Sequence, residues 1–148
     1  MSARSKFEIL VVEDNPADIT LLELLFREVK IPVRLHFARD GREGLDFVFK
    51  HGKFTQAPTP DLILIDRNLP IKNGGELLRA IKEDPRQRQI PVIMLTTSNN
   101  HAEIEEAYLL GVNAFISKPI DIDKYQEMIH TLCRFWFECA DLSTRPKR

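Results

Sequence analysis

The sequence lacks the features that would tie it to an oxidising compartment or to a membrane. It has only two cysteines, Cys133 and Cys139, in a helical pattern that separates them by about 9 Å, so they cannot form a disulfide bond while that helix continues. Reduced thiols and a cytoplasmic location are the simpler expectation. No apolar run approaches the roughly 20 residues that span a bilayer, and the N-terminus has no apolar signal-peptide segment. We therefore expect no membrane partner.

The sequence also has almost no excess of charge of one sign. The chain has 21 Lys and Arg against 22 Asp and Glu, a net charge of -1, which gives no long-range attraction to nucleic acid. The basic cluster at 145–148 is typical of a solvated chain end. The histidines are scattered without ligand spacing, which argues against a transition-metal site. They are His36, His51, His101 and His130.

Apolar runs and helical patterns alternate five times along the 148 residues, a length that suits one domain. The expected strands are 9–12, 33–38, 62–65, 91–95 and 114–116. Each is followed by a helix, and the first helix begins at Asn15 and Pro16, which suit a cap and the first helical position. Strands that are apolar throughout, not on alternate residues, indicate a parallel sheet with helices on both faces. The predicted fold is α/β, a doubly wound five-stranded parallel sheet in the order 2-1-3-4-5.

Polar side chains follow four of these strands where each one ends. They are Glu13 and Asp14, Asp66, Thr96 with Thr97, and Lys118. In doubly wound sheets the ligand site lies at the carboxyl ends of the strands, so these groups should share one edge. Either threonine could simply cap the next helix; we favour Thr96 because it directly follows the apolar run.

The chemistry of this set points to phosphorus. Three carboxylates at one edge repel one another unless a cation intervenes, and all-oxygen ligands with room for water suit Mg²⁺. Lys118 adds a compact positive charge for an incoming anion. The set is suited to make Asp66 a nucleophile toward a phosphoryl group.

These residues, in this order and strand context, resemble the signature of response-regulator receiver domains over about residues 7–133, which implies the flavodoxin-like receiver fold. The resemblance implies that Asp66 accepts a phosphoryl group from a sensor histidine kinase. It also implies a Mg²⁺ site at Glu13, Asp14, Asp66 and the backbone carbonyl of Asn68. Such a protein is a switch or phosphorelay carrier and not an enzyme with turnover.

The same resemblance assigns roles to the last strand and its exit. Lys118 would contact the phosphoryl group, and Pro119 is expected to follow a cis peptide bond. Phe115 takes the place of an aromatic residue that reports phosphorylation, with core packing as the alternative role. It has no hydroxyl, so an outward rotamer would gain no hydrogen bond.

The stretches CRFWF and LTTSNN resemble the stand-alone regulators that pair with phytochrome-type sensor kinases. The single receiver domain is expected to fill residues 1–148, with an extended C-terminal helix and tail at about 134–148. One stripe of that helix should face the sheet. Its members are Ile122, Tyr125, Ile129, Leu132 and Trp136.

Three adjacent aromatic residues of this helix, Phe135, Trp136 and Phe137, lead to the hypothesis of a homodimer interface. At 100° per residue Phe137 should lie well off the buried stripe. The alternative is that the tail folds back over these rings.

Two other functions stay open. An aspartate-nucleophile phosphatase would also place an aspartate and Mg²⁺ at a strand end. It would need a second acid two residues after Asp66, where this chain has Asn68. The other is a binding module that keeps the pocket but works without phosphorylation.

Overall fold

The computed structural model describes residues 6–67, 69, 71–97 and 99–145. The strands are β1 (Phe7–Val12), β2 (Val33–Ala38), β3 (Leu62–Asp66), β4 (Val92–Thr96) and β5 (Ala114–Ser117). The helices are α1 (Pro16–Arg27), α2 (Gly41–Phe49), α3 (Gly74–Glu83), α4 (His101–Leu109) and α5 (Ile122–Arg134). The described residues also form short 3-10 turns at Gly52–Phe54 and Gln87–Gln89 and a π-helical turn at Phe135–Cys139.

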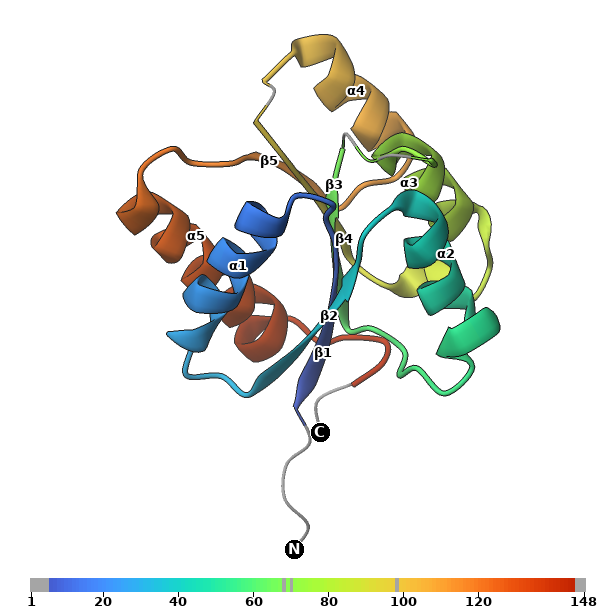
Figure 1. The fold of residues 1–148 in the computed structure, drawn as a ribbon, viewed down its shortest axis with the longest axis horizontal. Coiled ribbons are helices and arrows are strands. Elements are labelled where there is room, and N and C mark those ends of the chain that lie inside the picture. The colour runs from blue at the N-terminus through green and yellow to red at the C-terminus, as the bar shows by residue number, and fades with distance from the viewer. Residues whose placement is uncertain (1–5, 68, 70, 98, 146–148) are drawn as a thin grey trace, which may run out of the picture.

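All neighbouring strands pair in parallel, in the order β2-β1-β3-β4-β5. The predicted fold and strand order are therefore confirmed. Helices α1 and α5 cover one face of the sheet, and α2, α3 and α4 cover the other (Figure 1). None of the helices in the described residues is long and apolar enough to cross a membrane.

The core is two apolar layers, one on each face of the sheet. Successive residues of a strand point to opposite faces, so Leu10 and Val12 pack under α2 and α3 while Ile9 and Val11 pack under α1 and α5. β1, β3 and β4 lie in the middle of the sheet and are buried along almost their whole length. Because these strands are buried, the residues at their carboxyl ends are held in fixed positions.

Helix α1 begins at the residues that the sequence predicted for its cap and first turn. The side chain of Asn15 accepts hydrogen bonds from the N–H groups of Ala17 (2.8 Å) and Asp18 (3.2 Å), and Pro16 is the first helical residue. The cap leaves the preceding residues outside the helix, directly at the end of β1.

The C-terminal region differs from the expected continuous helix. α5 ends at Arg134, and the π-helical turn closes with a hydrogen bond from the Ala140 N–H to the Phe135 carbonyl (2.8 Å). A π-turn holds more residues than an α-turn, which rotates later side chains away from their α-helical positions. Phe137 is consequently buried and stacks on Phe7, with ring centroids 4.3 Å apart.

The expectation that Phe137 lies away from the buried stripe is therefore wrong. The tail packs back as well, since Leu142 is buried in the same apolar layer. Of the stripe, Tyr125, Ile129 and Leu132 are buried, whereas Ile122 at the first turn of α5 is 58% exposed. The alternative of a folded-back tail holds for Phe137 but not for Phe135, which is 52% exposed.

The tail also neutralises a buried charge at the end of the sheet where β3 begins. The Asp61 carboxylate accepts hydrogen bonds from the Glu8 N–H (2.8 Å), the Thr144 hydroxyl (2.6 Å) and the Arg145 Nε (3.1 Å). The Arg145 guanidinium also lies over the Phe7 ring, 5.0 Å from its centroid. Asp61 is 1% exposed, so its charge depends on these partners.

Replacing Arg145 with alanine is expected to lower the free energy of unfolding by about 3 kcal/mol, because it leaves a buried carboxylate without its cation. Urea denaturation followed by circular dichroism measures this loss. The control is Arg134→Ala, whose exposed side chain pairs with Glu138 at 3.8 Å and should cost less than about 0.5 kcal/mol. Equal losses in the two variants would mean that Asp61 does not depend on Arg145.

Candidate functional site

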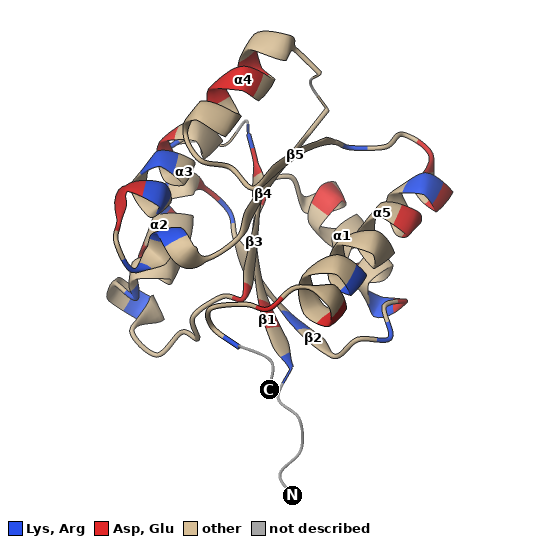
Figure 2. Cartoon of the chain, turned by 180° about the vertical axis from the view of Figure 1, so that it is seen from behind, with Lys and Arg blue, Asp and Glu red and all other residues tan. Residues whose placement is uncertain are grey.

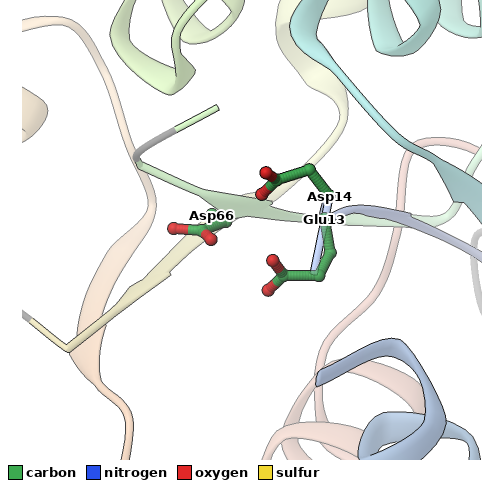
Figure 3. A group of neighbouring side chains, drawn as sticks. All are labelled: Glu13, Asp14 and Asp66. Carbon is green, nitrogen blue, oxygen red and sulfur yellow. The ribbon is translucent and has the colours of Figure 1, made fainter. Parts of the chain in front are cut away.

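The acidic site is built at the carboxyl ends of β1 and β3, which are hydrogen-bonded neighbours. Glu13 and Asp14 directly follow β1, and Asp66 is the last residue of β3. Carboxylate oxygens of the three residues lie within 4.8 Å of one another. Figure 3 shows the carboxylates of Glu13 and Asp14, from one strand end, gathered near the Asp66 carboxylate from the next. The predicted convergence of these acids is present in the structure.

The three acids differ in exposure. Glu13 is buried, Asp66 is half-buried and Asp14 is exposed. Glu13 also accepts a hydrogen bond of 3.3 Å from the Asn15 N–H, which helps fix its carboxylate at the strand end. The site is thus open to solvent at Asp14 and closed at Glu13.

The end of β3 is held close to the start of α3. The Gly74 N–H donates to the carbonyl of Arg67 at 3.0 Å. A Cβ at Gly74 would lie 2.7 Å from the Asp66 carbonyl oxygen, so only glycine permits this approach. The backbone on which Asp66 sits is therefore fixed from both sides.

Lys118 supplies the positive charge of the site from the loop after β5. Its Nζ lies 2.9 Å from Glu13 Oε1, 3.7 Å from Asp18 Oδ2 and 3.9 Å from Asp66 Oδ2. Its backbone N–H donates to the Thr96 carbonyl at 2.7 Å, which ties the end of β5 to β4. The Lys118–Pro119 peptide bond is trans, so the expectation of a cis bond is wrong.

Burial and charge act in opposite directions on these groups. Burial raises the pKa of Glu13 to about 7; the hydrogen bond and charge of Lys118 oppose the shift, and the nearby Asp66 adds to it. Burial alone would lower the pKa of Lys118, but the hydrogen bond to Glu13 and the charges of Asp66, Glu13 and Asp18 raise it above its usual value. Lys118 therefore stays charged beside carboxylates that crowd one another.

The remaining predicted residues take different positions. Thr96 ends β4 and is 1% exposed, whereas Thr97 is exposed. Phe115 is half-buried against the layer under α2 and α3, as its alternative core role requires, and its function as a reporter stays a prediction. Asn68, whose carbonyl was expected to bind the metal, lies outside the described residues.

Sequence reasoning missed one residue of this site. Asp18, in the first turn of α1, lies next to Lys118 although its sequence position resembles an ordinary helix N-terminus. Acidic residues are common there because they complement the helix dipole. Asp18 could have been found from its position three residues after the cap, because the first turn of α1 lies next to the end of β1.

The three acids fit a divalent metal. They offer only oxygen ligands, with Asp14 facing solvent, and Mg²⁺ in proteins takes one or two carboxylates and keeps several waters. Bound metal would relieve the repulsion between the carboxylates and would require Glu13 to be ionised when it acts as a ligand or close neighbour.

We expect Mg²⁺ affinity to rise with pH by up to about tenfold per unit below the Glu13 pKa of about 7, and to level off above it. The sign follows from proton release, because Mg²⁺ competes with the proton on Glu13. Without metal the same shift acts on folding: native Glu13 holds a proton that the unfolded chain has lost, so this contribution to stability falls as pH rises from about 4.5 to about 7.

Isothermal titration calorimetry with MgCl₂ across this pH range tests the expectation. Glu13→Gln should bind Mg²⁺ more weakly and with a flatter pH dependence, while Glu23→Gln, on the exposed side of α1, should match the wild type. A wild-type affinity that does not change with pH would contradict the assignment.

Comparison with known proteins identifies the family. Residues 9–130 match the family model of the response regulator receiver domain. Response regulator Rcp1 from Synechocystis sp. is 37% identical over 134 residues, which cover 90% of this chain and 91% of Rcp1.

Two solved structures are similar over nearly the whole chain. The phosphorylated cyanobacterial phytochrome response regulator RcpA is 37% identical, with a TM-score of 0.89 over 94% of this chain and 99% of RcpA. The Mn(2+)-bound form of Rcp1 is 36% identical, with a TM-score of 0.85 over 92% of this chain and 98% of that one. The model match, the identity and the shared fold agree: this chain belongs to the response regulator receiver family.

Proposed function

We propose that this protein is a phosphorylation switch that accepts a phosphoryl group on Asp66 from the phosphohistidine of a sensor kinase. The observation that carries the proposal is the convergence of three carboxylates within 4.8 Å, with the Lys118 Nζ 3.9 Å from Asp66 Oδ2. Family membership and the phosphorylated relative RcpA support it.

In the proposed transfer, a carboxylate oxygen of Asp66 attacks phosphorus as the P–N bond to the kinase histidine breaks. The electrons of that bond return to the imidazole nitrogen, which takes up a proton, and Asp66 becomes an acyl phosphate. Lys118, already charged and beside Asp66, would bind one phosphoryl oxygen. The Thr96 hydroxyl, at the end of β4, would donate a hydrogen bond to another.

Mg²⁺ held by Glu13, Asp14, Asp66 and the Asn68 carbonyl would neutralise charge on the phosphoryl oxygens. The acidic cluster and the Mn(2+)-bound relative support a divalent metal here. Glu13 also orients Lys118 through their 2.9 Å ion pair. The protein's part is therefore to hold the nucleophile, the cation and the hydroxyl in place.

The acyl phosphate adds up to two negative charges at one edge of the sheet. New contacts of Thr96 and Lys118 would shift the loops after β4 and β5, and with them the surface of α4, β5 and α5. Phe115, on β5, would report the change. A phytochrome-type kinase is the proposed phosphodonor, because the relatives include the phytochrome response regulator RcpA.

Asp66→Asn should abolish phosphorylation, because an amide oxygen is a poor nucleophile toward phosphorus. Incubation with an autophosphorylated histidine kinase and Mg²⁺, followed by mass spectrometry of the intact protein, measures the uptake. Asp46→Asn, on α2, is the control and should be labelled like the wild type. Uptake by the Asp66→Asn variant at the wild-type level would refute the proposal.

Two assays separate the other functions. Steady turnover of small phosphoesters by the wild type would support an aspartate-nucleophile phosphatase. Failure to bind beryllofluoride with Mg²⁺, or to take up any phosphoryl group, would support a binding module that acts without phosphorylation.

We also propose that the protein forms a homodimer through the exposed part of its C-terminal aromatic cluster. Phe135 is 52% exposed and meets the half-buried Trp136 edge to face, with ring centroids 5.0 Å apart. An exposed aromatic ring supported by a second aromatic ring is typical of an interface anchor. Phe137 is excluded from this role because it is buried inside the chain.

Phe135→Ala should weaken dimerisation more than about tenfold, since buried aromatic anchors at interfaces commonly contribute at least that much. Sedimentation equilibrium over a range of protein concentrations gives the dissociation constant. Leu24→Ala, which removes another half-exposed apolar side chain from α1, should leave it unchanged. A wild type that stays monomeric at high concentration would count against the dimer.

A further inference from the structure

Helix α4 is the helix least anchored in the apolar core. Ala107 is its one buried residue, and its Tyr108 and Leu109 are 50% and 87% exposed. The position of a helix with so little buried apolar surface depends on its polar contacts.

Arg67, the residue directly after Asp66, makes two of these polar contacts. Its Nη1 lies 3.4 Å from Glu103 Oε1, and its Nη2 lies 3.9 Å from Glu106 Oε2. The two glutamates lie on the same side of α4, one turn apart. The side chains of Arg67 and Glu103 are 23% and 31% exposed, so their pair is less screened by water than a pair of fully exposed side chains. Glu106 is 61% exposed, so its longer pair with Arg67 is screened more strongly.

The negative charge of α4 makes its ion pairs with Arg67 more important. The helix carries Glu103, Glu105 and Glu106 and has no lysine or arginine, as Figure 2 shows. His101 pairs with Glu105 at 2.8 Å, on the other part of the helix surface. Arg67 is therefore a cation that joins an acidic helix to the end of β3.

A third contact joins α4 to β5. The Phe115 N–H donates to the Tyr108 hydroxyl at 3.2 Å. α4 is thus held by polar contacts to β3 through Arg67 and to the edge strand β5 through Tyr108. A small change at the end of β3 or β5 would reach this helix first.

We propose that Arg67 is a positioning residue that holds α4 in its unphosphorylated position and so sets how readily the phosphorylated state forms. This inference rests on the proposed function. Contacts made in only one of two states stabilise that state, and removing them shifts the balance toward the other. In the proposed switch the phosphorylated state lacks the Arg67 contacts, so by linkage their loss tightens the binding of a phosphoryl group at Asp66.

Beryllofluoride, which stands in for the phosphoryl group, provides the test. In Mg²⁺ buffer its apparent affinity should rise about threefold to tenfold in Arg67→Met, from the loss of two partly screened ion pairs. Glu103→Gln with Glu106→Gln removes the same pairs from the other side and should give a similar rise. The variant with all three changes should show little further rise in beryllofluoride affinity, because the single and double variants remove the same ion pairs.

Hydrogen exchange without beryllofluoride supplies the second readout. The backbone amides of α4 should exchange faster in both variants, while those of α1 should not change. Arg79→Met, an exposed arginine on α3, is the control for the loss of one positive charge. A merely structural role for Arg67 would change the exchange of α4 without changing beryllofluoride affinity.

Unchanged or weaker beryllofluoride binding in the two variants would overturn the inference, as would an equal rise in Arg79→Met. Failure of the proposed function gives a different result, since the wild type itself would then not bind beryllofluoride.

Discussion

The structure depends on how one lysine and three carboxylates share the edge of a parallel sheet. Glu13, Asp14 and Asp66 are brought within 4.8 Å because neighbouring strands end side by side. Their mutual repulsion and the burial of Glu13 would oppose this arrangement without Lys118, which lies 2.9 Å from Glu13. The lysine neutralises only part of this charge, and the remaining negative charge, carried on oxygen ligands alone, suits a divalent metal ion.

The apolar strands provide the rigidity that this concentration of charge requires. β1, β3 and β4 are covered on both faces, so the residues at their ends cannot move apart to relieve repulsion. At the other end of the sheet, Arg145 and Thr144 of the tail satisfy the buried Asp61. Firmly packed elements therefore surround the site on most sides, and α4 is the exception. Motion that follows a change at Asp66 is expected where packing is weakest.

Much of the fold was predictable because its signals are local. Continuous apolar runs at 9–12 and 62–65 indicated buried parallel strands, and the residues Asn15 and Pro16 indicated the start of α1. The acids at the ends of these strands could also be predicted to meet, since parallel strands of one sheet end at one edge. Reasoning from strand ends could not find Asp18, because it lies on a helix, where an acid in the first turn has an ordinary role.

The sequence by itself determined the α/β order, the burial of the strands and the convergence of Glu13, Asp14, Asp66 and Lys118, since each follows from periodicity or from strand ends. Only the tertiary structure decided that a π-helical turn carries Phe137 into the core, that Arg145 neutralises Asp61, and that Arg67 pairs with α4. Each of these joins parts of the chain, or shifts a helical register, in ways that no local pattern records. Hydrophobic periodicity reports which side of an element is buried, but the partner of a charged side chain depends on how whole elements pack.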